Sequence, residues 1–258
     1  MGCAVSIEVI ETNRKLDEVR NHFKDKEMCH PNTQFVNLDD EQTQINDETQ
    51  HVILYRTKNT KATICDNFLN GKKNLLSVRT YKLNNVVSIE NWFLNQCPQL
   101  ETIDLSGCPD IKTIGSWFSV NNRNLQHVNF SDDANIKYVG PWFLNDCMKL
   151  KTLNLIGFFN IVSIESYFLN NCSNTAQVTI QDEFNLLLMI KLFRMKNIKI
   201  TKQRVLIPNT ECDICFDTKT DCFDIACCKN KHLCISCYNK RTNNQCWFCK
   251  QQFQIKTN

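Results

Sequence analysis

Residues 97–114 read CPQLETIDLSGCPDIKTI, and the apolar positions of this stretch return along the chain every 25 residues. The period is clearest in four aromatic pairs: Trp92-Phe93, Trp117-Phe118, Trp142-Phe143 and Tyr167-Phe168. The same register holds aliphatic and aromatic residues in each unit: Leu75, Leu100, Leu125 and Leu150; Val78, Ile103, Val128, Leu153 and Val178; Thr80, Leu105, Phe130, Leu155 and Ile180. A unit of this size cannot bury its apolar side without its neighbours, so the period predicts a solenoid of stacked coils.

Each unit contains an alternating segment such as Ile103-Asp104-Leu105, which predicts a short strand with alternate side chains inward and outward. Strands of successive units would pair in parallel, with outward side chains forming rows on a concave face. One row holds Arg79, Asp104, Asn129, Asn154 and Thr179, and the next holds Ser77, Thr102, His127, Thr152 and Gln177. Because polar solenoid faces bind other proteins, we expect Arg79, Asp104, Asn129 and Asn154 to contact a partner.

The L-x-x-L-x-L-x-x-C core between Leu100 and Cys108 is similar to a leucine-rich repeat of the cysteine-containing type, over roughly residues 50–205. The resemblance implies an α/β-like repeat solenoid with a parallel β-sheet on its concave face. We expect each Trp-Phe pair to be core on the convex side. Cys97, Cys147 and Cys172 recur at one repeat position, where Asn122 replaces one of them. Either residue type can hydrogen-bond the backbone at a coil corner, which favours a structural role over a metal site.

The repeats need caps at both ends. Residues 12–28 predict an amphipathic helix with Thr12 as N-cap and Leu16, Val19 and Phe23 on one face, and the polar residues 30–50 read as a loop or linker. At the far end the register is degraded over 184–195, and basic residues follow: Lys196, Lys199, Lys202 and Arg204. We interpret them as a solvated strand edge. The predicted domains are an N-terminal helix and linker over 1–50, a repeat solenoid over 51–207 and a small module over 211–252.

Nine of the 16 cysteines lie between positions 212 and 249. With one histidine they supply eight candidate ligands: Cys212, Cys215, Cys228, His232, Cys234, Cys237, Cys246 and Cys249. Pairs of cysteines separated by two residues form knuckles around one ion, and eight ligands suit two tetrahedral zinc ions. Cys227 remains an alternative to Cys228. So short a segment buries little apolar surface, so we expect it to need zinc to fold.

The order of these ligands resembles a RING finger. The resemblance implies that Cys212, Cys215, Cys234 and Cys237 bind one zinc and that the other four bind the second. It also implies an E3 ubiquitin ligase, which recruits a ubiquitin-conjugating enzyme and transfers ubiquitin without a nucleophile of its own. Ile214 would contact the conjugating enzyme, and Lys250 would touch both this enzyme and ubiquitin. The repeats would then hold the substrate protein, and no catalytic residue is assigned.

Two departures from the RING pattern leave an alternative open. Only one residue separates His232 from Cys234, and Trp247 stands where a proline is common. The alternative is a zinc-binding repeat scaffold without catalysis. A third hypothesis is a nucleic-acid binder that uses the basic stretch 196–204 with Lys229, Lys231, Lys240 and Arg241. A net charge of +3 gives the third hypothesis little support.

The remaining cysteines are scattered singly, which favours a reduced intracellular compartment over a disulfide scaffold. We expect a cytoplasmic, non-secreted protein without a transmembrane helix. The start Met1-Gly2-Cys3 fits an acylation pattern, with myristate on Gly2 and palmitate on Cys3. Membrane association through such lipids is an alternative to an unmodified, freely soluble chain.

Overall fold

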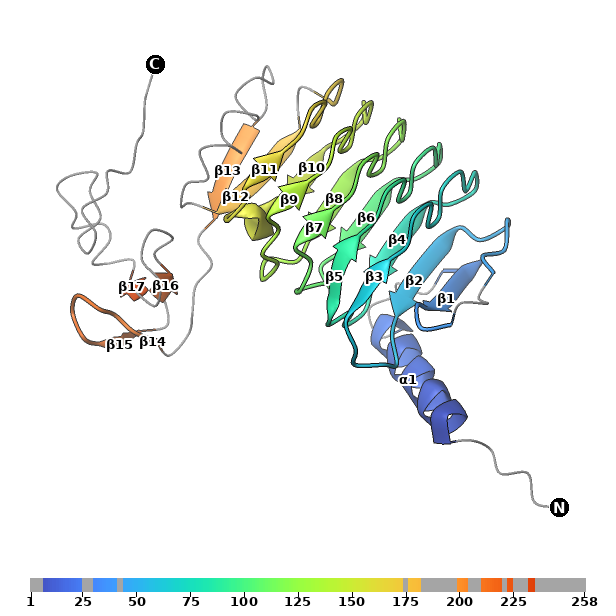
Figure 1. Cartoon of the computed structure of the whole chain (residues 1–258), viewed down its shortest axis with the longest axis horizontal. Coiled ribbons are helices and arrows are strands. Elements are labelled where there is room, and N and C mark those ends of the chain that lie inside the picture. The colour runs from blue at the N-terminus through green and yellow to red at the C-terminus, as the bar shows by residue number, and fades with distance from the viewer. Residues whose placement is uncertain are drawn as a thin grey trace.

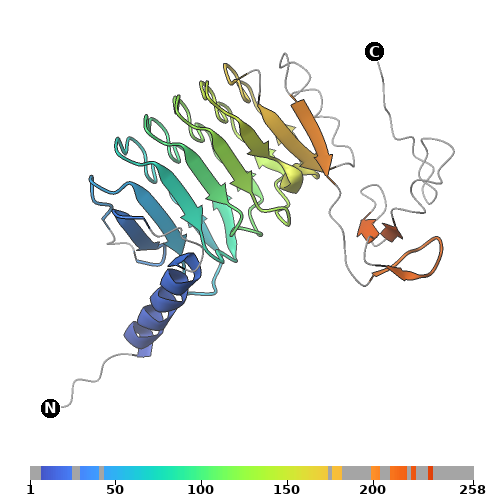
Figure 2. The same ribbon diagram turned by 180° about the vertical axis from the view of Figure 1, so that it is seen from behind.

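The computed structural model describes residues 7–24, 30–40, 44–173, 176–181, 199–203, 210–219, 222–224 and 232–234. Its main body is a stack of coils, each of which adds one strand to a long sheet (Figures 1 and 2). This sheet has eight strands in the order β1-β2-β4-β6-β8-β10-β12-β13, and all neighbours pair in parallel. Its strands are β1 (Thr33–Asn37), β2 (His51–Tyr55), β4 (Ser77–Thr80), β6 (Thr102–Leu105), β8 (His127–Phe130), β10 (Thr152–Asn154), β12 (Gln177–Gln181) and β13 (Lys199–Gln203).

A second parallel sheet runs along another side of the coils in the order β11-β9-β7-β5-β3. Its strands are β3 (Ala62–Ile64), β5 (Val86–Ile89), β7 (Thr113–Ile114), β9 (Tyr138–Val139) and β11 (Ser163–Ile164). The predicted repeat solenoid with a parallel sheet is confirmed. Its α/β-like part is not, because the described coils form a β-solenoid with one 3-10 turn, η1 (Ile156–Phe158). The β-branched residues of the second sheet, such as Val86 and Ile89 in β5 and Ile164 in β11, favour extended backbone over helix.

The predicted alternation in the long sheet is confirmed. The inward positions Val78, Ile103, Val128, Leu153 and Val178 are all buried to 1% exposure or less. Strand pairing joins residues 25 apart, for example Ser77 with Thr102 and Thr102 with His127. One period of the sequence thus corresponds to one coil of the solenoid. The apolar residues of successive coils form one continuous core.

The turn that follows the second sheet alternates between ordinary and left-handed backbone. In one coil Trp92, Leu94 and Gln96 have φ of 63°, 53° and 55°. Left-handed conformations cost non-glycine residues about 1–2 kcal/mol each. Here the N–H group of each of these residues donates to a carbonyl of an adjacent coil. Trp92 N and Gln96 N donate to the following coil, at Ser116 O and Val120 O, both at 2.9 Å. Leu94 N donates to the preceding coil, at Phe68 O, at 3.1 Å. Hydrogen bonds between coils therefore offset the strain in the turn.

The aromatic pairs divide between the interior and the surface. Phe93, Phe118 and Phe143 are fully buried and stack along the coils with ring centroids 5.4 and 5.2 Å apart. The neighbouring tryptophans are only half-buried, and their rings stack at 4.6 Å (Trp92 on Trp117) and 4.8 Å (Trp117 on Trp142). Tyr167 ends this stack and is 51% exposed. The expectation that both members of each pair are core is correct for phenylalanine and wrong for tryptophan.

The helix α1 (Ile7–Lys24) packs through its C-terminal half on the outward side of the long sheet, at the N-terminal end of the solenoid, and its other half projects beyond the strands (Figure 1). Val19 and Phe23, buried as predicted, pack against Ile53, Tyr55 and Tyr81. The helix begins at Ile7, five residues before the predicted N-cap Thr12. Strand β1 lies within residues 30–50, which were predicted to be a loop or linker, so this stretch adds an edge strand to the solenoid.

Two small antiparallel hairpins follow the repeats. Strand β14 (Thr210–Glu211) pairs with β15 (Thr218–Lys219), and β16 (Cys222–Asp224) pairs with β17 (His232–Cys234). Strand β13, which carries Lys199 and Lys202, is the last strand of the long sheet in the described residues, in line with the predicted strand edge. None of the helical segments that the structure describes has the length and apolar character needed to cross a bilayer.

Candidate functional site

The outward face of the long sheet carries the two predicted rows of polar side chains. Strand pairing places Arg79 beside Asp104, Asp104 beside Asn129, and Asn129 beside Asn154. The structure therefore brings together the four side chains that the sequence analysis assigned to partner binding. The same registers align the other row from Ser77 to Gln177.

Hydrogen bonds join three members of the first row to one another and tie Arg79 to the second row. The Asn154 amide donates to Asn129 Oδ1 at 2.9 Å, and the Asn129 amide donates to Asp104 Oδ1 at 3.1 Å. Arg79 donates to Ser77 Oγ at 2.9 Å. All five members of the row, Thr179 included, are half-buried. These bonds fix the rotamers, so the row forms a rigid polar floor whose ordering costs little entropy when a partner binds.

The second row is the more accessible one. His127, Thr152 and Gln177 are exposed, and His127 Nδ1 lies 2.8 Å from Thr152 Oγ1. At the other end of the row, burial lowers the pKa of His51, and the nearby His30 and Arg79 lower it further. A neutral His51 ring is therefore favoured beside Ser77 Oγ, which lies 2.8 Å from its Nδ1.

The repeated cysteines and Asn122 satisfy backbone carbonyls at one coil corner, as predicted. Each donates to the carbonyl 28 residues earlier: Cys97 Sγ to Leu69 O at 3.1 Å, Asn122 Nδ2 to Leu94 O at 2.7 Å, Cys147 Sγ to Ser119 O at 3.3 Å and Cys172 Sγ to Leu144 O at 2.9 Å. Each of the first three also accepts from the backbone 25 residues earlier: Lys72 bonds Cys97, Cys97 N bonds Asn122 Oδ1 at 2.7 Å, and Asn122 bonds Cys147. Burial raises the pKa of Cys97 to about 11, so the thiol keeps its proton and acts as a donor.

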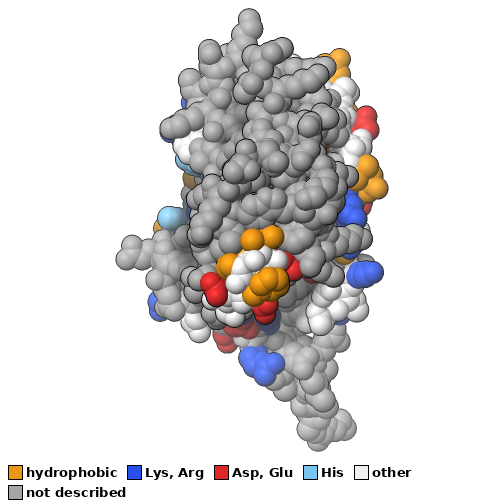
Figure 3. All heavy atoms as spheres, turned by 90° about the vertical axis from the view of Figure 1, so that its left-hand side faces the viewer, with side chains coloured by type: hydrophobic (Ala, Val, Ile, Leu, Met, Phe, Trp, Pro, Cys, Tyr) orange, Lys and Arg blue, Asp and Glu red, His pale blue; other side chains and the backbone are white. Residues whose placement is uncertain are grey.

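The first predicted zinc knuckle lies in a tight turn between β14 and β15. Phe216 N donates to Cys212 O at 2.8 Å, and Cys212 N donates to Asp217 O at 3.0 Å. Phe216 closes the turn with a left-handed φ of 57°. Cys212 is fully buried, whereas Cys215 and Ile214 are half-buried. Phe216 is 72% exposed, and hydrophobic and acidic side chains adjoin at this end of the molecule (Figure 3).

Strand β17 contacts β14 and carries two further predicted ligands, His232 and Cys234. Their backbone is described and their side chains are not. The other predicted ligands, Cys228, Cys237, Cys246 and Cys249, lie outside the described residues, as do Lys250, Gly2 and Cys3. Within the part of the chain that the structure describes, no three His, Cys, Asp or Glu side chains converge as they would on a metal ion. The two-zinc site thus stays a prediction.

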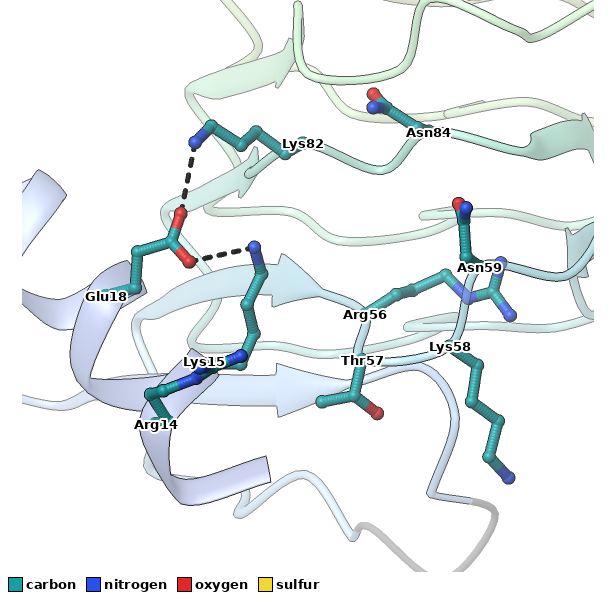
Figure 4. A pocket seen from close by; sticks show the side chains of 9 residues that line it. All are labelled: Arg14, Lys15, Glu18, Arg56, Thr57, Lys58, Asn59, Lys82 and Asn84. Atoms are coloured by element: carbon teal, nitrogen blue, oxygen red, sulfur yellow. Dashed lines mark hydrogen bonds and ion pairs between the residues drawn. The ribbon is translucent and has the colours of Figure 1, made fainter. Parts of the chain in front are cut away.

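A basic pocket of about 400 Å³ lies where α1 meets the loops after β2 and β4 (Figure 4). Sequence analysis missed it because its residues come from three separate segments. Its lining holds five cations, one carboxylate and three neutral polar residues: Arg14, Lys15, Arg56, Lys58, Lys82, Glu18, Thr57, Asn59 and Asn84.

Two carboxylates organise this basic pocket. Glu18 accepts from Tyr81 at 2.6 Å and from Lys15 and Lys82 at 3.0 Å each. These bonds, first that from Tyr81, lower the pKa of Glu18 to about 2. Below the lining, Asp39 pairs with the buried Arg56 at 2.6 Å and accepts from the N–H groups of Thr57 and Lys58 at 2.7 Å each.

The comparisons with known proteins bear on the repeats. Residues 54–176 and 110–213 match the family model described as BspA type leucine rich repeat region, in six copies, which together span more than half of the chain. The chain belongs to this family. The match supports the predicted leucine-rich repeats, but it assigns them to the BspA type and not to the cysteine-containing type. No curated protein and no solved structure matches. The matched region ends at Asp213, before the later cysteine pairs.

Proposed function

We propose that the protein is a repeat scaffold that holds a partner protein on the outward face of its long sheet and serves as a RING-type E3 ubiquitin ligase. Leucine-rich repeats suggest protein–protein interaction. The observation that carries the first part is the pair of aligned rows on β4, β6, β8, β10 and β12. The observation that supports the second part is the tight turn that joins Cys212 and Cys215.

The polar rows suit a protein partner better than a small molecule. Each coil adds one strand, so the rows form an extended surface that lengthens by one strand spacing, about 4.8 Å, with every coil. The hydrogen-bonded floor around Asn129 and Asn154 is already ordered, and the exposed His127, Thr152 and Gln177 stand beside it. A partner would gain hydrogen bonds from the second row without paying to order the first.

The turn between β14 and β15 fits a zinc knuckle. Its two cysteines lie three positions apart in a turn closed by the left-handed Phe216, and thiolates are the ligands that zinc prefers. Zinc, when bound, would cross-link this hairpin to β17 and stabilise the fold of the segment. Cys212, Cys215, Cys234 and Cys237 would hold one ion, and Cys228, His232, Cys246 and Cys249 would hold the other.

The roles of two residues follow from this proposal. Ile214 lies between the first two cysteines and is half-buried, which leaves part of its side chain available to a conjugating enzyme. Lys250 would contact this enzyme and ubiquitin together. The chain would contribute positioning alone, because bringing a charged conjugating enzyme close to a bound substrate lysine raises the rate of transfer.

Ubiquitin transfer tests the proposal. The full chain, incubated with a panel of conjugating enzymes and ubiquitin, should form polyubiquitin, and Ile214→Ala should lower the rate about tenfold or more while zinc content is unchanged. Val162→Ala is the matched control, because Val162 is an aliphatic residue on the solenoid that is 61% exposed. Equal rates for Ile214→Ala and the wild type, or no activity with any conjugating enzyme, would refute the ligase function.

One observation favours the alternative, a zinc-binding scaffold without catalysis. His232 and Cys234 are two apart in β17, and Cys222 is the pairing partner of Cys234. Positions two apart belong to the same face of a strand. The RING pairing, by contrast, requires His232 and Cys234 to bind different ions. The alternative predicts bound zinc and partner capture with no ubiquitin transfer.

A further inference from the structure

The basic pocket at the junction of α1 with the loops after β2 and β4 concentrates positive charge. Its lining holds five cations and one carboxylate, and Asp39 pairs with the buried Arg56 beneath the lining, so the site has a net charge of +3, equal to that of the whole chain. This charge density is not an outcome of overall composition. It results from the docking of α1 on the sheet, which brings Arg14 and Lys15 to the two loops.

The cations are held in place instead of being left to move in solvent. Lys15 and Lys82 each bond the same carboxylate, Glu18, which a further bond from Tyr81 fixes in position. Figure 4 shows Glu18 between the two ammonium groups. Two lysines from separate segments thus lie close together, although like charges repel, because one carboxylate stabilises both.

The loop that forms the opposite wall is rigid for a similar reason. Arg56 is 7% exposed, and its guanidinium donates to Asp39 and, at 2.6 Å, to Thr60 O. Asp39 also holds the backbone of the next two residues. The wall therefore presents Lys58 and Asn59 from an ordered turn.

We propose that this pocket binds a phosphate-bearing ligand. A phosphate monoester has close to two negative charges and three acceptor oxygens, which match several cations and amide donors in one concave site better than a single carboxylate does. The volume of about 400 Å³ falls within the usual range for small-ligand sites and admits more than a bare ion. The ligand would be a soluble phosphate ester or the headgroup of a phospholipid.

Binding measurements on the full chain distinguish these sources. We expect calorimetry to detect glycerol 3-phosphate, and we expect sedimentation to detect binding to phosphatidylcholine vesicles that contain phosphatidic acid but not to phosphatidylcholine alone. Arg14→Gln combined with Lys82→Gln should weaken either interaction about tenfold or more, since it removes two charge-assisted donors. The exposed pair Lys112→Gln and Lys149→Gln removes the same charge from the repeats and should have no effect.

Each outcome has a defined meaning. Binding of the soluble ester supports the pocket as a small-molecule site, and binding of the mixed vesicles alone supports a lipid headgroup. Circular dichroism of both double variants shows whether α1 remains folded. Equal affinities for the two double variants, or no binding of either probe, would overturn the proposal. So would binding of a phosphoserine peptide when neither smaller probe binds, because the site would then belong to a protein partner.

Discussion

Replacing Asn122 tests whether cysteine and asparagine have the same function at the coil corner. In Asn122→Ala, Leu94 O loses the hydrogen bond from Asn122 Nδ2, and Cys97 N loses the bond to Asn122 Oδ1, each 2.7 Å long. Asn122 is fully buried, so these two groups lie away from bulk water. A buried polar group left without a partner costs about 1–3 kcal/mol, so the two together cost about 4 kcal/mol.

The matched variant is Asn122→Cys, because cysteine occupies the same corner in three other coils. A thiol at position 122 can donate to Leu94 O and accept from Cys97 N, as Cys97 and Cys147 do in their coils. A thiol is a weaker donor than an amide, so we expect a loss of about 1 kcal/mol. Thermal unfolding followed by circular dichroism should show a fall in Tm of about 8–16 °C for the alanine variant and about 2–4 °C for the cysteine variant. Equal losses in the two variants would refute the equivalence.

Three further changes test the packing and charges of the solenoid. Phe118→Ala should lower the free energy of unfolding in urea by about 3–5 kcal/mol, because Phe118 is fully buried between Phe93 and Phe143. Trp117→Ala should cost less, because the ring of Trp117 is partly exposed. The reverse order would contradict the division of the aromatic pairs between interior and surface. Gly115→Ala would place a Cβ 2.7 Å from the backbone of Glu90, so we expect a loss of about 1–3 kcal/mol, and an unchanged Tm would show that the coils can separate at this corner. The pKa of Glu18 falls from 4.5 to about 2 on folding, so its contribution to stability is complete above pH 4.5 and is lost as the pH falls toward 2. The Tm difference between the wild type and Glu18→Gln should therefore disappear at low pH. A constant difference would show that the charge of Glu18 does not contribute to stability.

The sequence period was sufficient to predict the long sheet. Residues 25 apart share a position in every coil, so Val78, Ile103 and Val128 had to be neighbours in the core, and Arg79 and Asp104 had to be neighbours outside it. The exchange of Asn122 for cysteine also indicated a hydrogen-bonding corner. These predictions succeeded because a fixed repeat converts a distance in sequence directly into a contact between coils.

Other features depend on backbone geometry or on distant contacts, which the period does not encode. Trp117 has a left-handed φ of 61° and is half-buried, whereas the next residue, Phe118, is fully buried. Strand β1 was predicted as a loop because its stretch is polar, yet it pairs with β2 at the edge of the sheet. The basic pocket exists only because α1 docks beside Lys82, and no local pattern indicates that contact.

Metal analysis of the purified full chain tests the proposed ligase most directly. A chain with interleaved sites should contain two zinc ions, and Cys212→Ser should lose zinc together with ubiquitin transfer. A chain that contains one zinc ion or none, or one that retains both ions and its activity after this substitution, would contradict the RING assignment.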